Sequence, residues 1–465
     1  MAMFSIRRSR TIALALTAAL LVGACSSSAT ATPAPSPSPA PSTAPSAAAA
    51  ASAAPSASAA GQIGGDVTVW FAWGGQELKA FQDVLKPFTA QTGINVKLST
   101  VRDVSQIALN VTAGTSLPDI GLPPTPDNMA DWASKGVMKP LDGVLNWADY
   151  SANTFPALVN CPTTDCVGIG VIGGKHYSAF VKSQVKGLVW YNPKVFTGTP
   201  PTTWDALNAI TPPSGTKLWC TTLESGAASG WPASDDIANI VMRTTDAQHY
   251  MDWYNGKLKW TDPIIKNAYK LFGTMVSAAN VYGGSNTVLT TNFGKAGDPL
   301  FKTPPGCLFL EQATFITSFF VQDFPNVKAG TDYNFFPHPS INSQYDGNIE
   351  GFADSFVMYN DTPQAEALMK WITSADAQKI WVGDGGTLAA RKDVTNYPDA
   401  VSTAAAAVVG KAKNILLTAG DQMPADMQAA FWKSTLDFTN DQTKLDSILA
   451  RLDTVQAGAY ASPAP

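Results

Sequence analysis

Histidine and clustered positive charge are scarce in this chain of 465 residues. The three histidines, His176, His249 and His338, are too few and too far apart to predict a histidine-rich metal site. Charged residues make up 14% of the chain and the formal net charge is −5, whereas a typical soluble domain is roughly 25% charged. Because phosphate binding needs clustered Lys and Arg, this balance argues against nucleic acid as a main partner.

Recognisable catalytic motifs are also absent from the sequence. It contains no Walker A, GxSxG, HExxH or EF-hand pattern, and no histidine stands beside a Ser or Cys motif. Residues 168–173 formally match GxGxxG, but the dinucleotide fingerprint requires a preceding strand and a following helix. No helical pattern follows this stretch, so we interpret the match as coincidental. We therefore expect no cofactor, no metal ion and no enzymatic activity.

The N-terminus has the pattern of an export signal. Three arginines within the first ten residues precede an apolar run over 11–22, which is too short to span a bilayer comfortably. The run ends at Leu21-Val-Gly-Ala-Cys25, which is similar to a bacterial lipobox. This pattern predicts removal of residues 1–24 and lipidation of Cys25. The alternative is an ordinary secretory signal in which Cys25 is incidental.

A charge-free segment follows the predicted signal. Residues 26–60 contain only Ala, Ser, Thr and Pro, so they offer no side chains from which a core could form. Frequent proline favours an extended chain that reaches at most about 3.1 Å per residue. We interpret residues 25–62 as a lipidated tether that holds an exported body at the outer face of the cell membrane.

Cysteine usage agrees with export. Four cysteines lie beyond Cys25, and an even number in an oxidising compartment suggests two disulfides. Three connectivities are possible from the sequence; we favour Cys161–Cys166, which closes a small loop, and Cys220–Cys307, which ties distant segments together. A zinc site is the competing interpretation, but the sequence has neither a CxxC pair nor a suitably spaced histidine.

The body has an α/β pattern. A short apolar strand is predicted over 67–71, an amphipathic helix over 76–91 and a second strand over 94–98, with Gly93 ending the helix. A strand–helix–strand unit of this length implies parallel pairing through a right-handed crossover. Further helices are predicted over 104–114, 127–136, 233–254, 262–280, 362–382 and 423–452, and strands over 187–191, 307–310 and 355–359.

Tryptophan is plentiful, with 13 residues, all of them beyond residue 62. Sugars present apolar C–H faces flanked by hydroxyls, so a sugar site combines aromatic platforms with carboxylate or amide acceptors. Several aromatic stretches follow predicted strands, where ligand sites of α/β proteins gather. Most tryptophans in any protein nevertheless belong to the core, so the aromatic content alone does not identify a site.

Several segments, taken in order, resemble the extracellular solute-binding proteins of bacterial ABC importers for sugars, particularly the α-glucoside and maltose-type group. The resemblance covers roughly residues 65–455. It rests on these segments: Val69-Trp-Phe-Ala-Trp73, Leu117-Pro-Asp-Ile120, Lys186-Gly-Leu-Val-Trp-Tyr-Asn192, Pro201-Thr-Thr-Trp204, Glu224-Ser-Gly-Ala-Ala-Ser-Gly-Trp231, Pro305-Gly-Cys307, Asp421-Gln-Met-Pro424 and Ala430-Phe-Trp432.

The resemblance implies a two-lobed α/β fold of the periplasmic-binding-protein type (type II-like). Each lobe would be a mixed sheet flanked by helices, joined to the other by a multi-segment hinge. We expect residues 63–180 and 336–387 to form lobe 1, and residues 181–335 and 388–460 to form lobe 2.

The resemblance also implies ligand-contacting residues, which we carry over by motif. They are Trp73, Asp127, Trp231, Glu311, Phe315, Asp354 and Trp432. Two positions depart from the maltose-type pattern: Lys182 stands where those proteins carry an acid, and Phe315 replaces a tryptophan. These departures bear on which sugar is bound, not on the carbohydrate class.

The function implied is that of a membrane-tethered, monomeric receptor without catalysis. It would capture a neutral sugar or oligosaccharide between the lobes and deliver it to the permease subunits of an ABC importer. The alternatives are the same fold binding another solute, such as a polyol or a glycerol phosphate, and an extracellular glycan hydrolase that uses paired carboxylates. Only four arginines lie beyond residue 10, which favours a neutral ligand over an anionic one.

Overall fold

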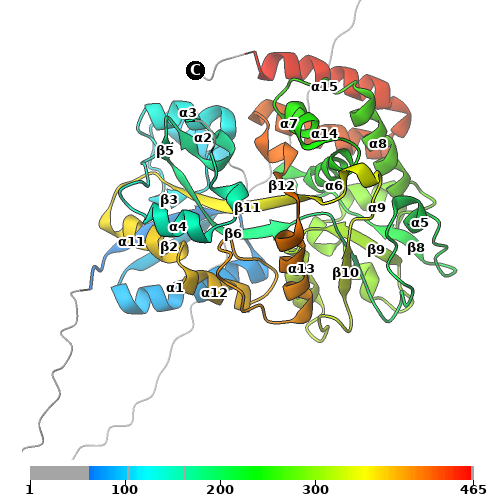
Figure 1. The fold of residues 1–465 in the computed structure, drawn as a ribbon, viewed down its shortest axis with the longest axis horizontal. Helices are drawn as coiled ribbons and strands as arrows, with labels where there is room; N and C mark the ends of the chain where they lie inside the picture. Colours follow the sequence, from blue (N-terminus) through cyan, green and yellow to red (C-terminus); the bar gives the residue numbers. More distant parts are fainter. Residues whose placement is uncertain (1–61, 102–104, 162–163, 462–465) are drawn as a thin grey trace, which may run out of the picture. The chain divides into compact units, whose positions relative to one another are not determined.

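A computed structural model describes residues 62–101, 105–161 and 164–461 of the chain (Figure 1). The predicted signal peptide, Cys25 and the tether up to residue 61 lie outside these described residues. The folded body is built on two main β-sheets, one of six strands and one of four. None of the helices among the described residues is long and apolar enough to cross a bilayer.

The six-stranded sheet has the order β12-β11-β3-β1-β2, and β6 pairs with β11 beside this path. Strands β1 and β2 pair in parallel, whereas β11 is antiparallel to both β3 and β6. The sheet is therefore mixed. Its strands are β1 (Asp66–Phe71), β2 (Asn95–Thr100), β3 (Ile120–Gly121), β6 (Ser178–Val185), β11 (Asn348–Met358) and β12 (Asn414–Leu417).

The four-stranded sheet has the order β10-β7-β9-β8. Strands β8 and β9 are parallel, and the other pairs are antiparallel. The chain enters this sheet directly from β6, because only Lys186 and Gly187 separate β6 from β7. Its strands are β7 (Leu188–Tyr191), β8 (Lys217–Cys220), β9 (Cys307–Gln312) and β10 (Asn334–Pro337).

The first strand–helix–strand unit has the predicted form. Helix α1 (Gly75–Thr92) connects β1 to β2, and it buries Phe81, Val84 and Phe88. Gly93 ends the helix in the left-handed conformation with φ 68°, which a residue without Cβ adopts most easily. The predicted parallel pairing of the two flanking strands is confirmed.

Three of the predicted long helices are wrong in length, because capping residues interrupt them. The helix expected over 233–254 divides into α6 (Trp231–Met242) and α7 (Ala247–Tyr254), and the Asp246 side chain caps α7. The helix expected over 362–382 divides into α11 (Pro363–Ile372) and α12 (Ala375–Gly383), where Ser374 is the cap. The C-terminal helix divides likewise into α14 (Ala425–Asn440) and α15 (Leu445–Ala459).

The remaining α-helices connect and cover the two sheets (Figure 1). Helices α4, α9, α10 and α13 have no counterpart among the helices predicted from the sequence. These helices are α2 (Ser105–Ala113), α3 (Pro126–Ser134), α4 (Trp147–Asn153), α5 (Trp204–Asn208), α8 (Pro263–Met275), α9 (Gly284–Thr290), α10 (Ile316–Asp323) and α13 (Ala400–Lys411).

The GxGxxG stretch is not a nucleotide loop. Residues 167–169 form a short 3-10 turn, and the chain then makes the hairpin of β4 (Val171–Ile172) and β5 (Lys175–His176). Dinucleotide binding requires a helix N-terminus at this place. The interpretation of the match as coincidental is confirmed.

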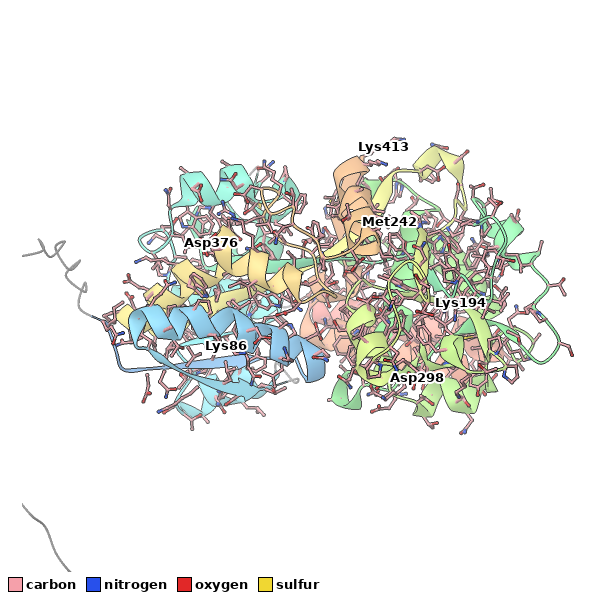
Figure 2. All side chains as sticks on the ribbon, turned by 90° about the horizontal axis from the view of Figure 1, so that it is seen from below. Lys86, Lys194, Met242, Asp298, Asp376 and Lys413 are labelled. Carbon is pink, nitrogen blue, oxygen red and sulfur yellow. A yellow bond between two sulfur atoms is a disulfide. The ribbon has the colours of Figure 1, made fainter. Side chains whose placement is uncertain are left out.

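Each sheet has its own hydrophobic core. One core gathers around β1, α1 and α12, and the other gathers around β8, α6, α8 and α14. Met242 is buried in the second core, whereas Lys86, Lys194 and Asp376 are exposed (Figure 2). Trp219, Trp253, Trp260 and Trp381 are almost fully buried in these two cores, and Trp190 is equally buried in a third core that includes residues of β7, β9 and α13.

Both favoured disulfides are present. The Cα atoms of Cys161 and Cys166 are 5.6 Å apart, and those of Cys220 and Cys307 are 5.7 Å apart, which is the usual distance across a disulfide. The second disulfide joins β8 to β9 within the four-stranded sheet. The residue limits given for the two lobes stay a prediction; the strand pairing places β6 and β12 in the six-stranded sheet.

Candidate functional site

A cavity of about 330 Å³ lies where the six-stranded sheet meets the segment leading into α14. Its volume falls at the lower end of the range typical of small-molecule sites. Carboxylates, hydroxyls and aromatic rings share the lining, which includes Phe180, Asp354, Ser355, Thr418, Asp421 and Trp432. We refer to this cavity as the central cleft.

A β-bulge shapes the wall of the central cleft that β11 provides. Asp354 pairs with Lys182 of β6, but the next residue, Ser355, pairs with Phe180, so Val181 is the extra residue. Consecutive side chains of a regular strand point to opposite faces. Bulges re-aim side chains and are common beside functional sites. Here both Asp354 and Ser355 line the cleft.

Lys182 anchors this wall from inside the protein. Its Nζ lies 2.8 Å from Oε1 of Glu77, in the first turn of α1, and 3.2 Å from Oδ2 of Asp354. The ammonium also lies 4.5 Å from the centre of the Trp73 ring, which is a cation–π distance. Burial alone would lower the pKa of Lys182, but the two carboxylates outweigh it and raise this pKa. The lysine is therefore charged.

A second buried lysine lies behind the opposite wall. The Nζ of Lys186 is 2.7 Å from Oδ2 of Asp235, which lies on α6. Burial raises the pKa of Asp235 to about 7, although Lys186 acts in the opposite direction. Asp421 is exposed to the cleft, yet desolvation by the surrounding protein raises its pKa; the charge of Lys186 lowers it and that of Asp354 raises it further. The charges of Lys186 and Asp354 therefore both act on the pKa of Asp421.

The structure brings two of the predicted ligand contacts into the central cleft. Asp354 lies on β11, and Trp432 lies on α14 with its ring half-buried. Trp231 and Phe315 lie together nearby, with ring centres 5.9 Å apart. The centre of the Trp231 ring is also 5.9 Å from Nζ of Lys186. These two aromatics lie outside the described lining of the cleft.

The other predicted contacts lie elsewhere or cannot be placed. Trp73 is buried in the core of the six-stranded sheet, with its ring centre 5.1 Å from that of Phe81. Glu311 is buried on β9, where its Oε2 is 3.6 Å from Nε2 of His338. Asp127 belongs to the first turn of α3, and its side chain is outside the described part of the structure. The ligand roles of all seven residues stay predictions.

Several residues of this site are missing from the contacts predicted by motif. Asp421 is not among the predicted contacts, although it belongs to the family motif Asp421-Gln-Met-Pro424. An acidic residue in a motif so close to Trp432 could have indicated a ligand contact. Glu77 gives no local signal, because its partner Lys182 is 105 residues away. Among the described residues, no cluster of His, Cys, Asp and Glu is arranged to hold a metal ion.

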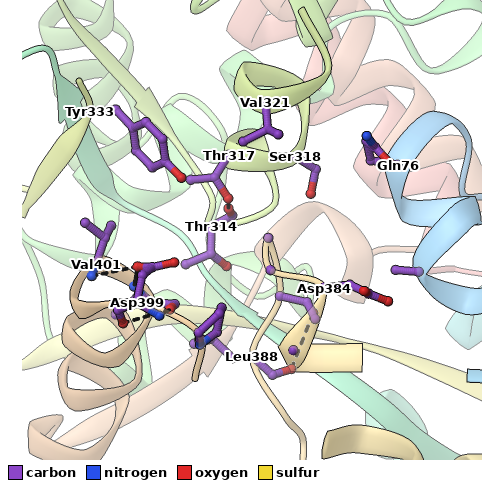
Figure 3. Close-up of a pocket in the computed structure, with 18 of the residues that line it drawn as sticks. Gln76, Thr314, Thr317, Ser318, Val321, Tyr333, Asp384, Leu388, Asp399 and Val401 are labelled. Carbon is purple, nitrogen blue, oxygen red and sulfur yellow. Dashed lines mark hydrogen bonds between the residues drawn. The ribbon is translucent and has the colours of Figure 1, made fainter. Parts of the chain in front are cut away.

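A second cavity, of about 380 Å³, lies between α1, α10, the start of α13 and the loop over 383–388 (Figure 3). Gln76, Ser318, Asp384 and Tyr333 contribute polar groups to it. The described linings of the two cavities have no residue in common. The seven predicted ligand contacts are not among the residues that line this second cavity.

Known sequences that are similar to this chain are described as solute-binding proteins. The profile described as "Bacterial extracellular solute-binding protein" matches residues 83–409. The osmoprotective compounds-binding protein GgtB of Synechocystis sp. is 30% identical over 375 residues, which cover 78% of this chain and 86% of that protein. The alpha-glucosides-binding periplasmic protein AglE of Rhizobium meliloti is 31% identical over 398 residues, which cover 82% of this chain and 85% of that protein.

Comparison with solved structures gives the fold. A chitin oligosaccharide binding protein superimposes with a TM-score of 0.71 at 19% identity, over 85% of this chain and 99% of that one. The solute-binding protein RafE in complex with raffinose superimposes with a TM-score of 0.65 at 16% identity, over 85% of this chain and all of that one. The predicted two-lobed α/β fold is confirmed.

Proposed function

The chain belongs to the family of bacterial extracellular solute-binding proteins, and from this premise we propose that it captures a neutral sugar between its two lobes for an ABC importer. The observation that carries the proposal is the lining of the central cleft. Carboxylates of Asp354 and Asp421 share this cleft with the half-buried ring of Trp432. Carboxylates accept hydrogen bonds from sugar hydroxyls, and an aromatic ring packs on the C–H face of a pyranose.

The charges around the central cleft favour an uncharged solute. Its described lining contains no Lys, Arg or His. The two lysines behind its walls are engaged with acids, Lys182 with Glu77 and Asp354, and Lys186 with Asp235. An anion such as a glycerol phosphate would face Asp354 and Asp421 without a cation in the lining, which is electrostatically unfavourable.

Solute capture would couple the two lobes. Asp354 belongs to the six-stranded sheet, whereas Trp432 lies on α14, which packs in the core of the four-stranded sheet. A solute that contacts both groups binds best when the two lie close, so it favours the closed arrangement through differential affinity. No bond of the solute is broken in this mechanism, and the protein acts as a receptor.

The curated relatives narrow the ligand class that we propose. AglE is named for alpha-glucosides and GgtB for osmoprotective compounds. A cavity of about 330 Å³ suits a small glycoside better than a long oligosaccharide. We therefore propose a small α-glucoside as the solute. The permease would be the membrane partner.

We also propose that the receptor is a monomeric lipoprotein at the outer face of the cell membrane. The basis is the lipobox-like sequence ending at Cys25 and the Ala/Ser/Thr/Pro composition of residues 26–60. Mass spectrometry of the protein purified from membranes tests this proposal. A diacylated N-terminal Cys25 is expected, and a free N-terminus at another residue would contradict it.

Isothermal titration calorimetry against a panel of solutes tests the proposed function. The panel contains methyl α-D-glucopyranoside, trehalose, maltose, raffinose, galactose, N,N′-diacetylchitobiose, glycerol and glycerol 3-phosphate. We expect saturable binding of at least one α-glucoside, and no binding of glycerol 3-phosphate. Binding of glycerol 3-phosphate alone, or of none of these compounds, would contradict the proposal.

A pair of tryptophan variants tests whether the solute binds in the central cleft. Trp432→Ala removes the ring in the cleft and is expected to weaken binding about tenfold, a typical loss for a central aromatic contact. Trp371→Ala, on α11 and against Phe88, removes a tryptophan outside the cleft lining and should leave the affinity unchanged. Recovery of the sugar unchanged after prolonged incubation distinguishes the receptor from a glycan hydrolase.

A further inference from the structure

We propose that Lys182 is a positioning residue that fixes the carboxylate of Asp354 for one particular hydroxyl of the solute, and that Glu77 holds Lys182 in place. Lys182 itself would not contact the solute. The inference rests on the proposed function, because it concerns how the same cleft selects among sugars. It assigns a role to a position that departs from the maltose-type pattern.

The backbone places Lys182 and Asp354 opposite each other. They are direct cross-strand partners of β6 and β11, on the last pair before the β-bulge. Side chains of directly opposed residues have Cβ atoms about 4.5–5.5 Å apart. The ion pair of 3.2 Å therefore follows from strand register and requires no unusual backbone.

The side-chain surroundings keep the ammonium away from the solute. Lys182 is 1% exposed, and it lies between Glu77, Asp354 and the faces of Trp73 and Trp381, whose ring centres are 4.5 and 5.9 Å from Nζ. An ammonium has three donors. One donor is directed at Glu77, while Asp354 is in ion-pair contact and the Trp73 ring lies against the ammonium.

The Asp354 carboxylate contacts Lys182 on its buried side and lines the central cleft on its other side. Its side chain keeps 15% of its surface exposed, whereas that of Lys182 keeps 2%. The carboxylate thus reaches the central cleft while one oxygen is engaged inside the protein. An acceptor that is already fixed loses little conformational entropy when a hydroxyl binds.

Fixing the acceptor has a consequence for selectivity. A site built to accept a hydrogen bond strongly rejects an analogue that lacks the donor, because the buried acceptor is then left without a partner. A mobile carboxylate could turn toward another hydroxyl or toward water, and it would discriminate less. Lys182 therefore contributes to selectivity more than to overall affinity. In this arrangement the Trp73 ring supports Lys182 and does not stack on the sugar.

The test compares methyl α-D-glucopyranoside with its 2-, 3-, 4- and 6-deoxy analogues by calorimetry, for the wild-type protein and its variants. Wild type is expected to bind one deoxy analogue about 10- to 100-fold more weakly than the parent, the usual effect of losing a hydrogen bond to a charged group. Lys182→Met should reduce that one ratio to about threefold or less. The ratios for the other analogues should stay unchanged.

Further variants separate positioning from structural damage. Lys182→Arg retains a cation between the two acids and should restore most of the lost selectivity. Glu77→Gln keeps Lys182 but weakens its anchor, so an intermediate ratio is expected. Lys97→Met removes another lysine of the six-stranded sheet, one paired with Asp66 at the surface, and should leave every ratio unchanged. Melting curves establish that each variant is folded.

The outcomes distinguish this inference from the proposed function. If wild type binds no sugar of the panel, the proposed function fails and this inference fails with it. If wild type binds and Lys182→Met keeps the full selectivity, or loses affinity for all analogues by one common factor, only the positioning role is overturned. Should Lys182→Met fail to fold, unchanged selectivity in Glu77→Gln would overturn it.

Discussion

Lys182 and Lys186 are both buried and lie four residues apart, but the acids around them differ. Lys182 pairs with Glu77 and Asp354, whose side chains keep 18% and 15% of their surface exposed. Lys186 pairs with the buried Asp235, and it lies near the buried Glu350 and near Asp421, which is exposed to the central cleft. Both direct partners of Lys182 are therefore partly exposed, and one of them lines the central cleft, whereas the direct partner of Lys186 is buried.

The buried acids extend beyond Lys186. Asp236, Glu311 and Glu350 are all buried, and burial is the largest cause of the raised pKa of each. Arg243 and Lys186 are the nearby cations, so the acids outnumber the positive charges. Burial without a full set of counter-ions disfavours the charged form of a carboxyl and so raises its pKa. Both lysines are buried, so burial of the acid, and not of its lysine partner, decides whether a carboxylate is available to a solute.

The largest expected effect on stability comes from removing Lys186, the cation beside the buried acids Asp235 and Glu350. Lys186→Met leaves Asp235 and Glu350 buried without their nearest positive charge, so the free energy of unfolding should fall by about 3–5 kcal/mol at pH 7.5. Lys182→Met should cost less, about 1–2 kcal/mol, because its partners are partly hydrated. Urea denaturation measures both values.

A matched control is the exposed Lys194, which pairs with Asp332 at the surface. Lys194→Met should change the free energy of unfolding by less than about 0.5 kcal/mol. Equal losses for the Lys182 and Lys186 variants would contradict the distinction between the two surroundings.

The next effect concerns the pH dependence of stability. Burial raises the pKa of Glu311 to about 8, although the charge of Arg243 acts in the opposite direction. The folded protein then holds a proton that the unfolded chain releases near its ordinary pKa of about 4.3. The stability that Glu311 contributes is therefore fully present below about pH 4 and is lost as the pH rises through 8.

Glu311→Gln tests this sign. The amide cannot ionise, so the free energy of unfolding should decline less steeply between pH 5 and pH 8 than in wild type, by an amount on the order of 3–4 kcal/mol across this range. Urea denaturation at several pH values measures the slope. Glu366→Gln, at a partly exposed position on α11 beside Lys370, is the control and should reproduce the wild-type profile. A steeper profile for Glu311→Gln would refute the assignment.

The same contrast explains what the sequence could predict. The unit of β1, α1 and β2 follows from local periodicity, because its apolar residues face one core. Strand β6 has no such signal, since Lys182, Ser183 and Gln184 are all buried by partners far along the chain. The breaks before α7 and α12 depend on single capping residues within otherwise helical patterns.

The candidate site was predictable only in part for the same reason. Trp432 belongs to a family motif and Asp354 is a polar contact that the resemblance implies, and both line the central cleft. Glu311 belongs to the same class of residue, but its burial beside His338 depends on tertiary packing that no local pattern records. The sequence position of an acidic residue does not reveal whether its side chain faces a cavity or a core.

The smallest expected effect involves Asp421, the acid that both surroundings influence. Desolvation raises its pKa, Lys186 lowers it and Asp354 raises it further, while its side chain remains exposed to the central cleft. Asp421→Asn removes the charge and keeps the shape, so binding of methyl α-D-glucopyranoside should weaken by about 1 kcal/mol, the cost of replacing a charged acceptor by a neutral one. The free energy of unfolding should change by less than about 0.5 kcal/mol, because the acid is not sealed in the protein.

Calorimetry and urea denaturation of the same sample measure the change in affinity and the change in stability separately. A loss of stability without a loss of affinity would show that Asp421 acts with the buried acids around Lys186. An acid that lines the central cleft would then serve the stability of the fold and not the binding of solute.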